Sequence, residues 1–191
     1  METVPLRKRI LDTIVRKSSL KQKVFDNTFW AFNLLKETLL EMASEMDDDL
    51  DGKLDRRVRI EYRDRGKFEA QLQVANDLLI FQMHTDVFEF DANHLVWQTP
   101  YVQADRENSY CGVVNIYNFL SDSFKFNRNA DEGYLIGRIF INRERRYFVE
   151  GKHQSSMRAM EFGRAEIDRD ALVAILESGI AFALDFDLLM A

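Results

Sequence analysis

The chain has 191 residues, of which 46% are hydrophobic and 30% are charged, and its formal net charge at pH 7 is −6. This composition fits one folded domain spanning residues 1–191 and excludes a disordered chain, which lacks the apolar residues that offset the entropy lost on folding. With Cys111 as its one cysteine, the chain can form neither an internal disulfide nor a zinc site built from cysteines.

The N-terminal stretch is basic, whereas the rest of the chain is acidic. Residues 1–24 carry seven Lys and Arg against two acids, a local charge of +5, which leaves −11 on the remainder. An acidic body argues against a general nucleic-acid binder, because neutralising phosphates requires a sustained basic surface. No run approaches the roughly 18 apolar residues of a membrane span, and no secretory signal is recognisable, so we expect a cytoplasmic protein.

Helical spacing dominates residues 3–46. Leu6, Ile10 and Ile14 recur every four residues, as on one face of a helix. Ser18 and Ser19 interrupt this pattern, and Ser19 with Gln22 matches a capping box, so a second, longer helix is expected to begin there. Its broad apolar stripe is suited to packing on a sheet, and the helix is expected to end at the acidic run that starts with Asp47.

The pattern then changes to the alternation of β-strands, and residues 57–150 are expected to form an antiparallel sheet of about five to seven strands. In the first hairpin a three-residue loop, 64–66, pairs Tyr62 with Phe68 and gives Gly66 a left-handed conformation. The remaining predicted strands are one at 78–83, a hairpin of 87–90 with 94–98, one at 110–119, and a hairpin of 134–142 with 145–150. As an alternative, residues 115–124 could form a short helix. A C-terminal helix over 168–189 is expected to be capped by Asp168 and to pack on the sheet. Together these elements predict the α+β class.

An aspartate-rich segment joins the long helix to the sheet. Asp47, Asp49, Asp51 and Asp55 stand at the first, third, fifth and ninth positions of an EF-hand-type loop, and Gly52 stands at the sixth. Calcium is held by several such oxygen ligands on a tight loop, so this segment is a candidate calcium site. The twelfth position, however, is not the required glutamate, and a strand follows in place of a second helix. The alternative is an acidic turn without a cofactor.

Two pairs of polar residues near predicted turns are the candidates for catalysis. His84 with Asp86, and Asp91 with His94, lie on adjacent segments, and imidazole and carboxylate groups of this kind occur together in hydrolytic and metal sites. Their spacing matches no dedicated motif, and the chain contains no GxSxG, P-loop, GxGxxG or HExxH sequence. Whether the chain is an enzyme is therefore left open, with the balance against it.

Arginines line the polar face of the first predicted hairpin. Arg57, Arg59 and Arg63 alternate with apolar residues there, and a second basic hairpin follows at 138–152. Such a face can hold a phosphorylated or acidic ligand. Charged strand faces also serve to prevent edge-to-edge pairing of sheets, which is the structural alternative.

Three classes of function remain. The first is a non-enzymatic interaction module, of a regulatory, adaptor or chaperone-like kind, that binds a protein partner or itself, for instance as a homodimer. The second is an ion- or small-ligand-binding domain that uses the aspartate loop or the arginine face, and the third is an enzyme with a dispersed site. The basic amphipathic N-terminal segment is expected to dock on its own domain or on a second subunit, with an anionic membrane as the alternative.

Overall fold

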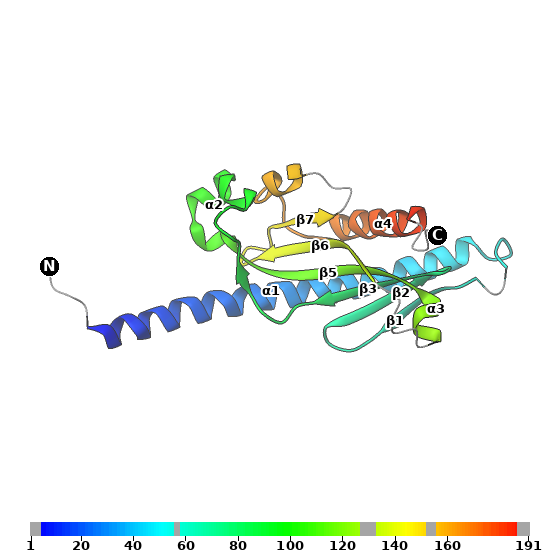
Figure 1. The fold of residues 1–191 in the computed structure, drawn as a ribbon, viewed down its shortest axis with the longest axis horizontal. Helices are drawn as coiled ribbons and strands as arrows, with labels where there is room; N and C mark the ends of the chain where they lie inside the picture. Colours follow the sequence, from blue (N-terminus) through cyan, green and yellow to red (C-terminus); the bar gives the residue numbers. More distant parts are fainter. Residues whose placement is uncertain (1–4, 56–57, 127–132, 152–155, 187–191) are drawn as a thin grey trace.

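The computed structural model describes residues 5–55, 58–126, 133–151 and 156–186, and shows a long helix beneath a twisted antiparallel sheet with a shorter helix beside it (Figure 1). In chain order the elements are α1 Leu6–Asp49, β1 Ile60–Asp64, β2 Glu69–Val74, β3 Asp77–Met83, β4 Phe88–Glu89, η1 Leu95–Gln98, α2 Pro100–Ala104, η2 Arg106–Ser109, β5 Tyr110–Leu120, α3 Ser121–Lys125, β6 Tyr134–Asn142, β7 Tyr147–Gly151, η3 Ser156–Glu161 and α4 Arg169–Asp185. The predicted α+β class is confirmed.

α1 is one helix of 44 residues, so the predicted break at Ser18 and Ser19 is wrong. The stretch contains no proline or glycine, and serine within a helix is only a few tenths of a kcal/mol less favourable than alanine. That penalty is too small to end a helix that is anchored further along. The helix also runs past the predicted end at residue 46, through Asp49.

The strands form one antiparallel sheet in the order β1-β2-β3-β5-β6-β7, and β4 pairs with β5. β5 is the longest strand, with eleven residues, and lies between β3 and β6. The prediction of a strand at 110–119 is confirmed over its whole length. The alternative of a short helix within 115–124 is wrong for 115–120, which belong to β5, but the helix α3 does begin at Ser121. The predicted pairing of the last two strands is also confirmed.

The register of the first hairpin differs from the prediction. Tyr62 lies opposite Leu72 and Asp64 opposite Ala70, so the loop is longer than three residues and Tyr62 does not pair with Phe68. The predicted buried face is nevertheless right. The partner of Tyr62 is Leu72 and not Phe68, a shift of four residues, and an even shift leaves the same side chains on the same face because they alternate with a period of two. Gly66 does adopt a positive φ, of 101°.

The hairpin predicted for 87–90 with 94–98 does not form. β4 pairs with β5, while η1 is a 3₁₀ turn. The His94 side chain begins this turn by accepting a hydrogen bond from the Val96 N–H, and the Trp97 indole donates to the Asp91 carbonyl. These local side-chain bonds give the backbone an alternative to strand pairing.

Two hydrophobic clusters occupy opposite faces of the sheet. α1 and α4 cover one face, where Phe32, Leu39 and Leu176 are almost fully buried against strands that include β3 and β6. On the other face, phenylalanines of β6, β7 and the connecting turns pack together beneath η1, α2 and η3. As predicted, Asp168 caps α4, whose Ala171 N–H donates to the aspartate. The predicted continuation of this helix over 187–189 falls outside the described residues.

No helix in the described part of the chain combines the length and the apolar content needed to cross a bilayer.

Candidate interaction surface

The N-terminal third of α1 extends beyond the body of the protein. It leaves the end of the sheet as a free helical arm (Figure 1). Every residue from 5 to 19 is exposed, and Leu20 is the first buried position of the helix. We refer to residues 6–19 as the arm.

An apolar stripe runs along this arm. Its large aliphatic side chains have exposed fractions between 49% and 68%, and they are Leu6, Ile10, Leu11, Ile14 and Val15. The polar positions around the stripe are mostly basic, with five Lys and Arg against one aspartate. A contiguous exposed apolar surface rimmed by polar residues is typical of a binding site.

The stripe continues the face that the rest of α1 turns to the sheet. Eighteen residues make five whole turns of an α-helix, so Leu6, Ile10 and Ile14 lie in line with three positions further along α1. Those positions are Val24, Thr28 and Phe32, and all three have an exposed fraction of 0%. The arm thus carries the pattern of a packed helix at a place where the body supplies nothing to pack on.

The turn between β6 and β7 holds α1 where it enters the body. Asn27 donates through Nδ2 to the carbonyl oxygens of Asn142 and Arg143, at 3.2 and 2.7 Å. Arg145, with φ of 59°, stacks its guanidinium over the Trp30 ring at 4.0 Å. These contacts hold α1 against the β6–β7 turn. They begin at Asn27, about two helical turns after Leu20, the first buried residue of α1.

Buried hydrogen bonds keep that turn rigid. The side chain of Asn142 is fully buried; its Oδ1 accepts from the N–H groups of Glu144 and Arg146, and its Nδ2 donates to the Tyr101 hydroxyl and the Asn108 carbonyl. The Tyr101 hydroxyl in turn donates to Glu144 at 2.6 Å. Burial, together with the nearby Glu144 carboxylate, raises the pKa of Tyr101 well above its usual range, so this hydroxyl remains a donor.

An ion-pair cluster extends the same anchor to η2. Arg143 bonds the carboxylates of Asp105 and Glu107, and its Nε donates to Asn108. The Glu107 backbone N–H and the Arg143 guanidinium lower the pKa of Asp105. Glu107 also lies 3.9 Å from Arg16 of the arm. Because Arg16 is largely exposed, this last contact contributes little to stability.

A basic groove lies on the sheet face opposite α1. It encloses about 750 Å³, and its charged lining is Arg59, Arg63, Arg65, Lys125 and Asp122. The Gln73 amide oxygen accepts from Arg63 at 3.1 Å, and the Gln71 amide oxygen accepts from Arg65 at 3.0 Å, so two of the guanidinium groups are oriented. The structure therefore brings together two of the three predicted arginines, while Arg57 lies outside the described residues.

The histidine and aspartate candidates are not gathered into one site. The His84 backbone N–H donates to Val113 on β5, whereas the His94 ring bonds Glu150 on β7 at 2.9 Å, and β6 separates these strands. His84 accepts from the Asp86 N–H, and Asp91 from the Asn93 N–H, which are local turn contacts.

The predicted calcium ligands are also not assembled. α1 continues through Asp47 and Asp49, which lie about 200° apart around its axis because successive residues are separated by about 100°. Asp51 and Asp55 follow in the turn after the helix, where Gly52 has φ of 72°. Across the described ranges no group of three or more His, Cys, Asp or Glu side chains is placed to hold a metal ion.

The anchor around Asn142 was not foreseen from the sequence. Asn27 and Asn142 are ordinary residues in an amphipathic helix and at a strand end, and no motif marks their pairing across 115 positions. The arm, by contrast, was recognisable as a basic amphipathic segment, but the structure does not dock it on its own body.

Comparisons with known proteins identify no relative. No family model, no curated protein and no solved structure matches this chain.

Proposed function

We propose that this protein is a non-enzymatic interaction module, of a regulatory, adaptor or chaperone-like kind, which binds a protein partner or a second copy of itself through the arm. The exposed stripe of Leu6, Ile10, Leu11, Ile14 and Val15 is the single observation that carries the proposal. Five aliphatic side chains on one helical face give an apolar surface that a partner would remove from water, at roughly 25 cal/mol per Å².

The anchoring of the arm suits it to this role. A free helix of 14 residues is marginal in water, but the arm extends a helix that is already held at Asn27 and Trp30. Because the body nucleates the helix and sets its direction, a partner that binds the arm meets most of it already ordered. Less conformational entropy is then lost on binding.

A protein partner fits the arm better than a membrane surface does. Helices that lie on membranes present Trp, Phe or Leu to the lipid. The arm has leucines, but residues 5–24 contain no aromatic residue. The charge of −11 outside residues 1–24 would also oppose approach to an anionic bilayer. The same acidic surface supports the absence of general nucleic-acid binding, and we place the protein in the cytoplasm.

Photo-crosslinking in the producing cell tests the proposal. A photoreactive phenylalanine analogue placed at Ile10 or Val15 should trap a protein in a discrete adduct, with the same probe at Arg9 as the matched control outside the stripe. Mass spectrometry then identifies the adduct. A protein, whether this chain or another, supports the proposal. Adducts with lipid alone, or equal labelling from all three positions, would refute it.

The basic groove supports a second candidate, the binding of a small anionic ligand. Its lining has four basic residues and one acid, Asp122, and Arg63 is also paired with Glu61 at 2.7 Å, so the groove keeps a net positive charge in a protein whose net charge is negative. Isothermal titration with pyrophosphate tests this candidate, and Arg65→Gln should weaken the binding at least about tenfold, since charge-assisted hydrogen bonds contribute about 1.5–3 kcal/mol. Binding that does not change in this variant counts against the groove.

A further inference from the structure

We infer that the partner of the arm is a second copy of this chain, and that the arm is received by the groove between β7 and α4. This inference rests on the proposed function, because it names the occupant of the same surface. Three observations bear on it: a groove with apolar walls that the described residues leave open, opposite charges on arm and groove, and a similar length of the two.

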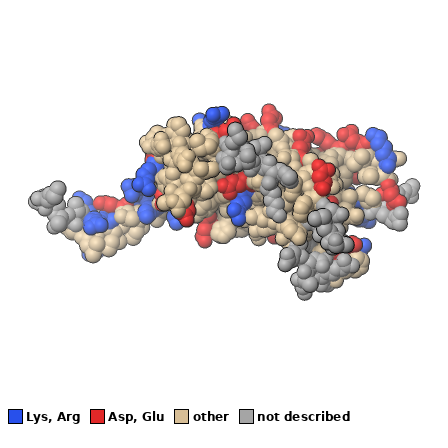
Figure 2. All heavy atoms as spheres, turned by 45° about the horizontal axis from the view of Figure 1, so that its top comes forward, with Lys and Arg blue, Asp and Glu red and all other residues tan. Residues whose placement is uncertain are grey.

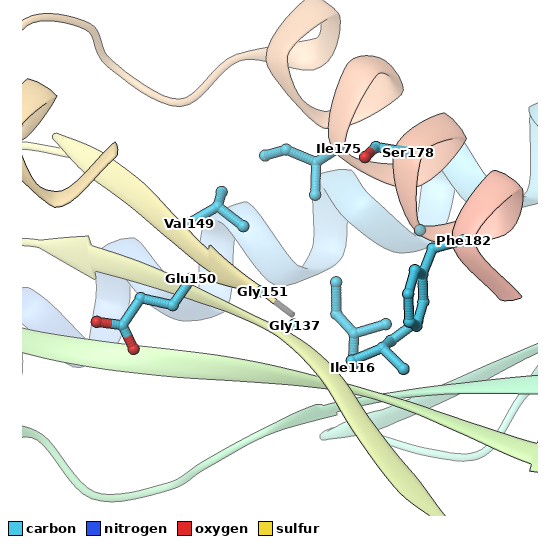
Figure 3. A pocket seen from close by; sticks show the side chains of 10 residues that line it. Ile116, Gly137, Val149, Glu150, Gly151, Ile175, Ser178 and Phe182 are labelled. Atoms are coloured by element: carbon cyan, nitrogen blue, oxygen red, sulfur yellow. The ribbon is translucent and has the colours of Figure 1, made fainter. Parts of the chain in front are cut away.

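The groove begins at a small apolar cavity where β6 and β7 face α4 (Figure 3). The cavity encloses about 40 Å³, and its apolar walls include Ile116, Val149, Ile175 and Phe182. Val149 and Ile175 also line an adjoining hollow of about 420 Å³, which extends along α4 past Ala171 and Ala174. The two hollows are thus neighbours that share these two residues, and the second is bordered on its far side by Glu161 and Arg164.

Among the residues that the structure describes, the sheet ends at this groove. β7 is an edge strand of five residues, while its neighbour β6 has nine. α1 and α4 already lie side by side on this face, so a third helix beside α4 would continue the helical layer over the sheet edge. An aliphatic stripe such as that of the arm is the kind of surface that packs in such a position.

The charges of arm and groove are opposite. Residues 161–185, which border the groove, contain six acids and two arginines. Four of these eight charges are already paired: Arg164 with Glu161, Arg169 with Glu41 of α1, and Glu166 with Arg146. Asp168 caps α4, so the excess of negative charge is carried by Asp170, Glu177 and Asp185. Figure 2 shows blue side chains along the arm and red ones over the part of the molecule where α4 lies. Two arms paired with each other would instead place like charges together, so charge favours arm to groove over arm to arm.

The lengths correspond, and two-fold symmetry closes the assembly. The 14 residues of the arm span about 21 Å and the 17 residues of α4 about 25 Å, at 1.5 Å per residue. The arm leaves one end of the molecule and α4 lies toward the other (Figure 1). Two copies in antiparallel orientation therefore bring each arm to the partner's α4, and both contacts are equivalent, as in most homodimers.

Analytical ultracentrifugation of the full chain between about 1 and 100 μM tests the inference. We expect a concentration-dependent monomer–dimer equilibrium that Ile10→Asp abolishes and that Arg9→Gln only weakens. Ile10 is exposed, so this substitution should leave the circular dichroism spectrum unchanged, and a lost dimer cannot be attributed to unfolding. A chain that stays monomeric at 100 μM overturns the inference. The proposed function would still stand if the photo-crosslinks identify another protein.

Charge reversal separates arm-to-groove from arm-to-arm pairing. One variant replaces two basic residues of the arm by acids (Arg9→Glu with Lys17→Glu), which brings the net charge of the arm from +4 to 0. Another replaces two acids at the groove border by lysine (Glu161→Lys with Asp185→Lys). Each alone should dimerise at least tenfold more weakly than the wild type, whereas their mixture should form a heterodimer. A chain carrying all four changes should regain its homodimer. Continued monomer formation by the fourfold variant would overturn the groove as the arm's site. An arm variant that by itself dimerises more tightly than the wild type would also overturn it, because arm-to-arm pairing gains when the repulsion between two basic arms is removed.

Disulfide trapping locates the contact. Ile10→Cys together with Ser178→Cys, whose side chain borders the cavity, should yield a covalent dimer on mild oxidation. The native Cys111 is fully buried, and its thiol pKa is raised well above the usual range by that burial, so it does not compete. Arg9→Cys with Ser178→Cys is the control. Equal trapping from both pairs would contradict the assigned face of the arm.

Discussion

The two parts of α1 obey the same helical pattern but have opposite surroundings. Residues 20–49 bury Phe32, Leu35 and Leu39 against the sheet, while the arm exposes aliphatic side chains in the same rows. The boundary between them falls where the sheet ends, and the helix itself does not change there. Whether a helix face is buried therefore depends on what packs against it. The spacing of apolar residues along the helix does not carry that information.

Charge distinguishes the two parts where hydrophobic spacing does not. The arm is basic, whereas from Glu37 onward α1 carries six acids, the last three of them the run 47–49, and no Lys or Arg. Within one molecule the two charged ends lie far apart along a rigid helix. In the antiparallel dimer that we infer, the basic arm would lie beside the partner's α4, which packs next to the acidic part of α1.

Truncating a buried side chain in the packed part should have the largest effect on stability. We expect Leu39→Ala to lower the free energy of unfolding by about 2–5 kcal/mol, because it loses burial and leaves a cavity. Ile14→Ala in the arm should change it by less than about 0.5 kcal/mol. Urea titration in dilute protein, where the arm is free, measures both. A loss of stability above about 1 kcal/mol for Ile14→Ala would show that Ile14 is packed in the monomer, as Leu39 is, and would contradict the exposed arm.

The close approach of α1 to β5 gives the next largest effect. A Cβ added to Gly112 would lie 2.3 Å from the Thr28 hydroxyl oxygen, so Gly112→Ala should cost about 1–3 kcal/mol of stability. Adding Thr28→Ala removes two of the three clashing atoms and should restore part of the loss. Gly179→Ala is the control: its Cβ meets nothing within 4 Å, and helix propensity predicts a gain of up to about 1 kcal/mol. Equal losses of stability at Gly112 and Gly179 would contradict the close contact between Gly112 and Thr28.

The sequence predicted those parts of the fold that repeat with a fixed period. The strand at 110–119, the last hairpin and the helix capped by Asp168 all have strong local patterns, and the structure confirms them. The first hairpin shows the limit of this reasoning. Alternation identified the buried face of Tyr62 but not its partner, since a displacement by an even number of residues leaves the faces unchanged.

The candidate surface was predicted only in part, for a related reason. The basic amphipathic character of the arm is visible in the residues themselves, and so are the arginines of the groove. Exposure of the arm depends on where the sheet ends, and the Asn27–Asn142 anchor joins residues more than a hundred positions apart. Neither leaves a local signal, and a single sequence cannot show which polar residues meet in space.

Acid should weaken the anchor between the arm and the body. Because the folded protein lowers the pKa of Asp105 below its usual value of 3.8, the ionised form adds stability above that value, and the contribution is lost as the pH falls through the lower, folded pKa. Asp105→Asn keeps the acceptor for the Glu107 N–H but not the charge. We expect its melting temperature to lie below that of the wild type at pH 7 and the gap to close below about pH 4. A gap that does not change with pH would exclude the charge as its cause.

The smallest effect concerns the two serines at the junction of arm and body, and its sign is informative. If Ser18 and Ser19 are interior helical residues, as in the structure, changing both to alanine should strengthen the arm by about 0.5–1 kcal/mol in total. Amide hydrogen exchange at residues 8–17 should then become slower. If Ser19 instead caps a separate second helix, the same change removes a cap and exchange becomes faster. Slower exchange in the arm with an unchanged urea midpoint for the body would show that the arm is a rigid extension whose order does not depend on packing.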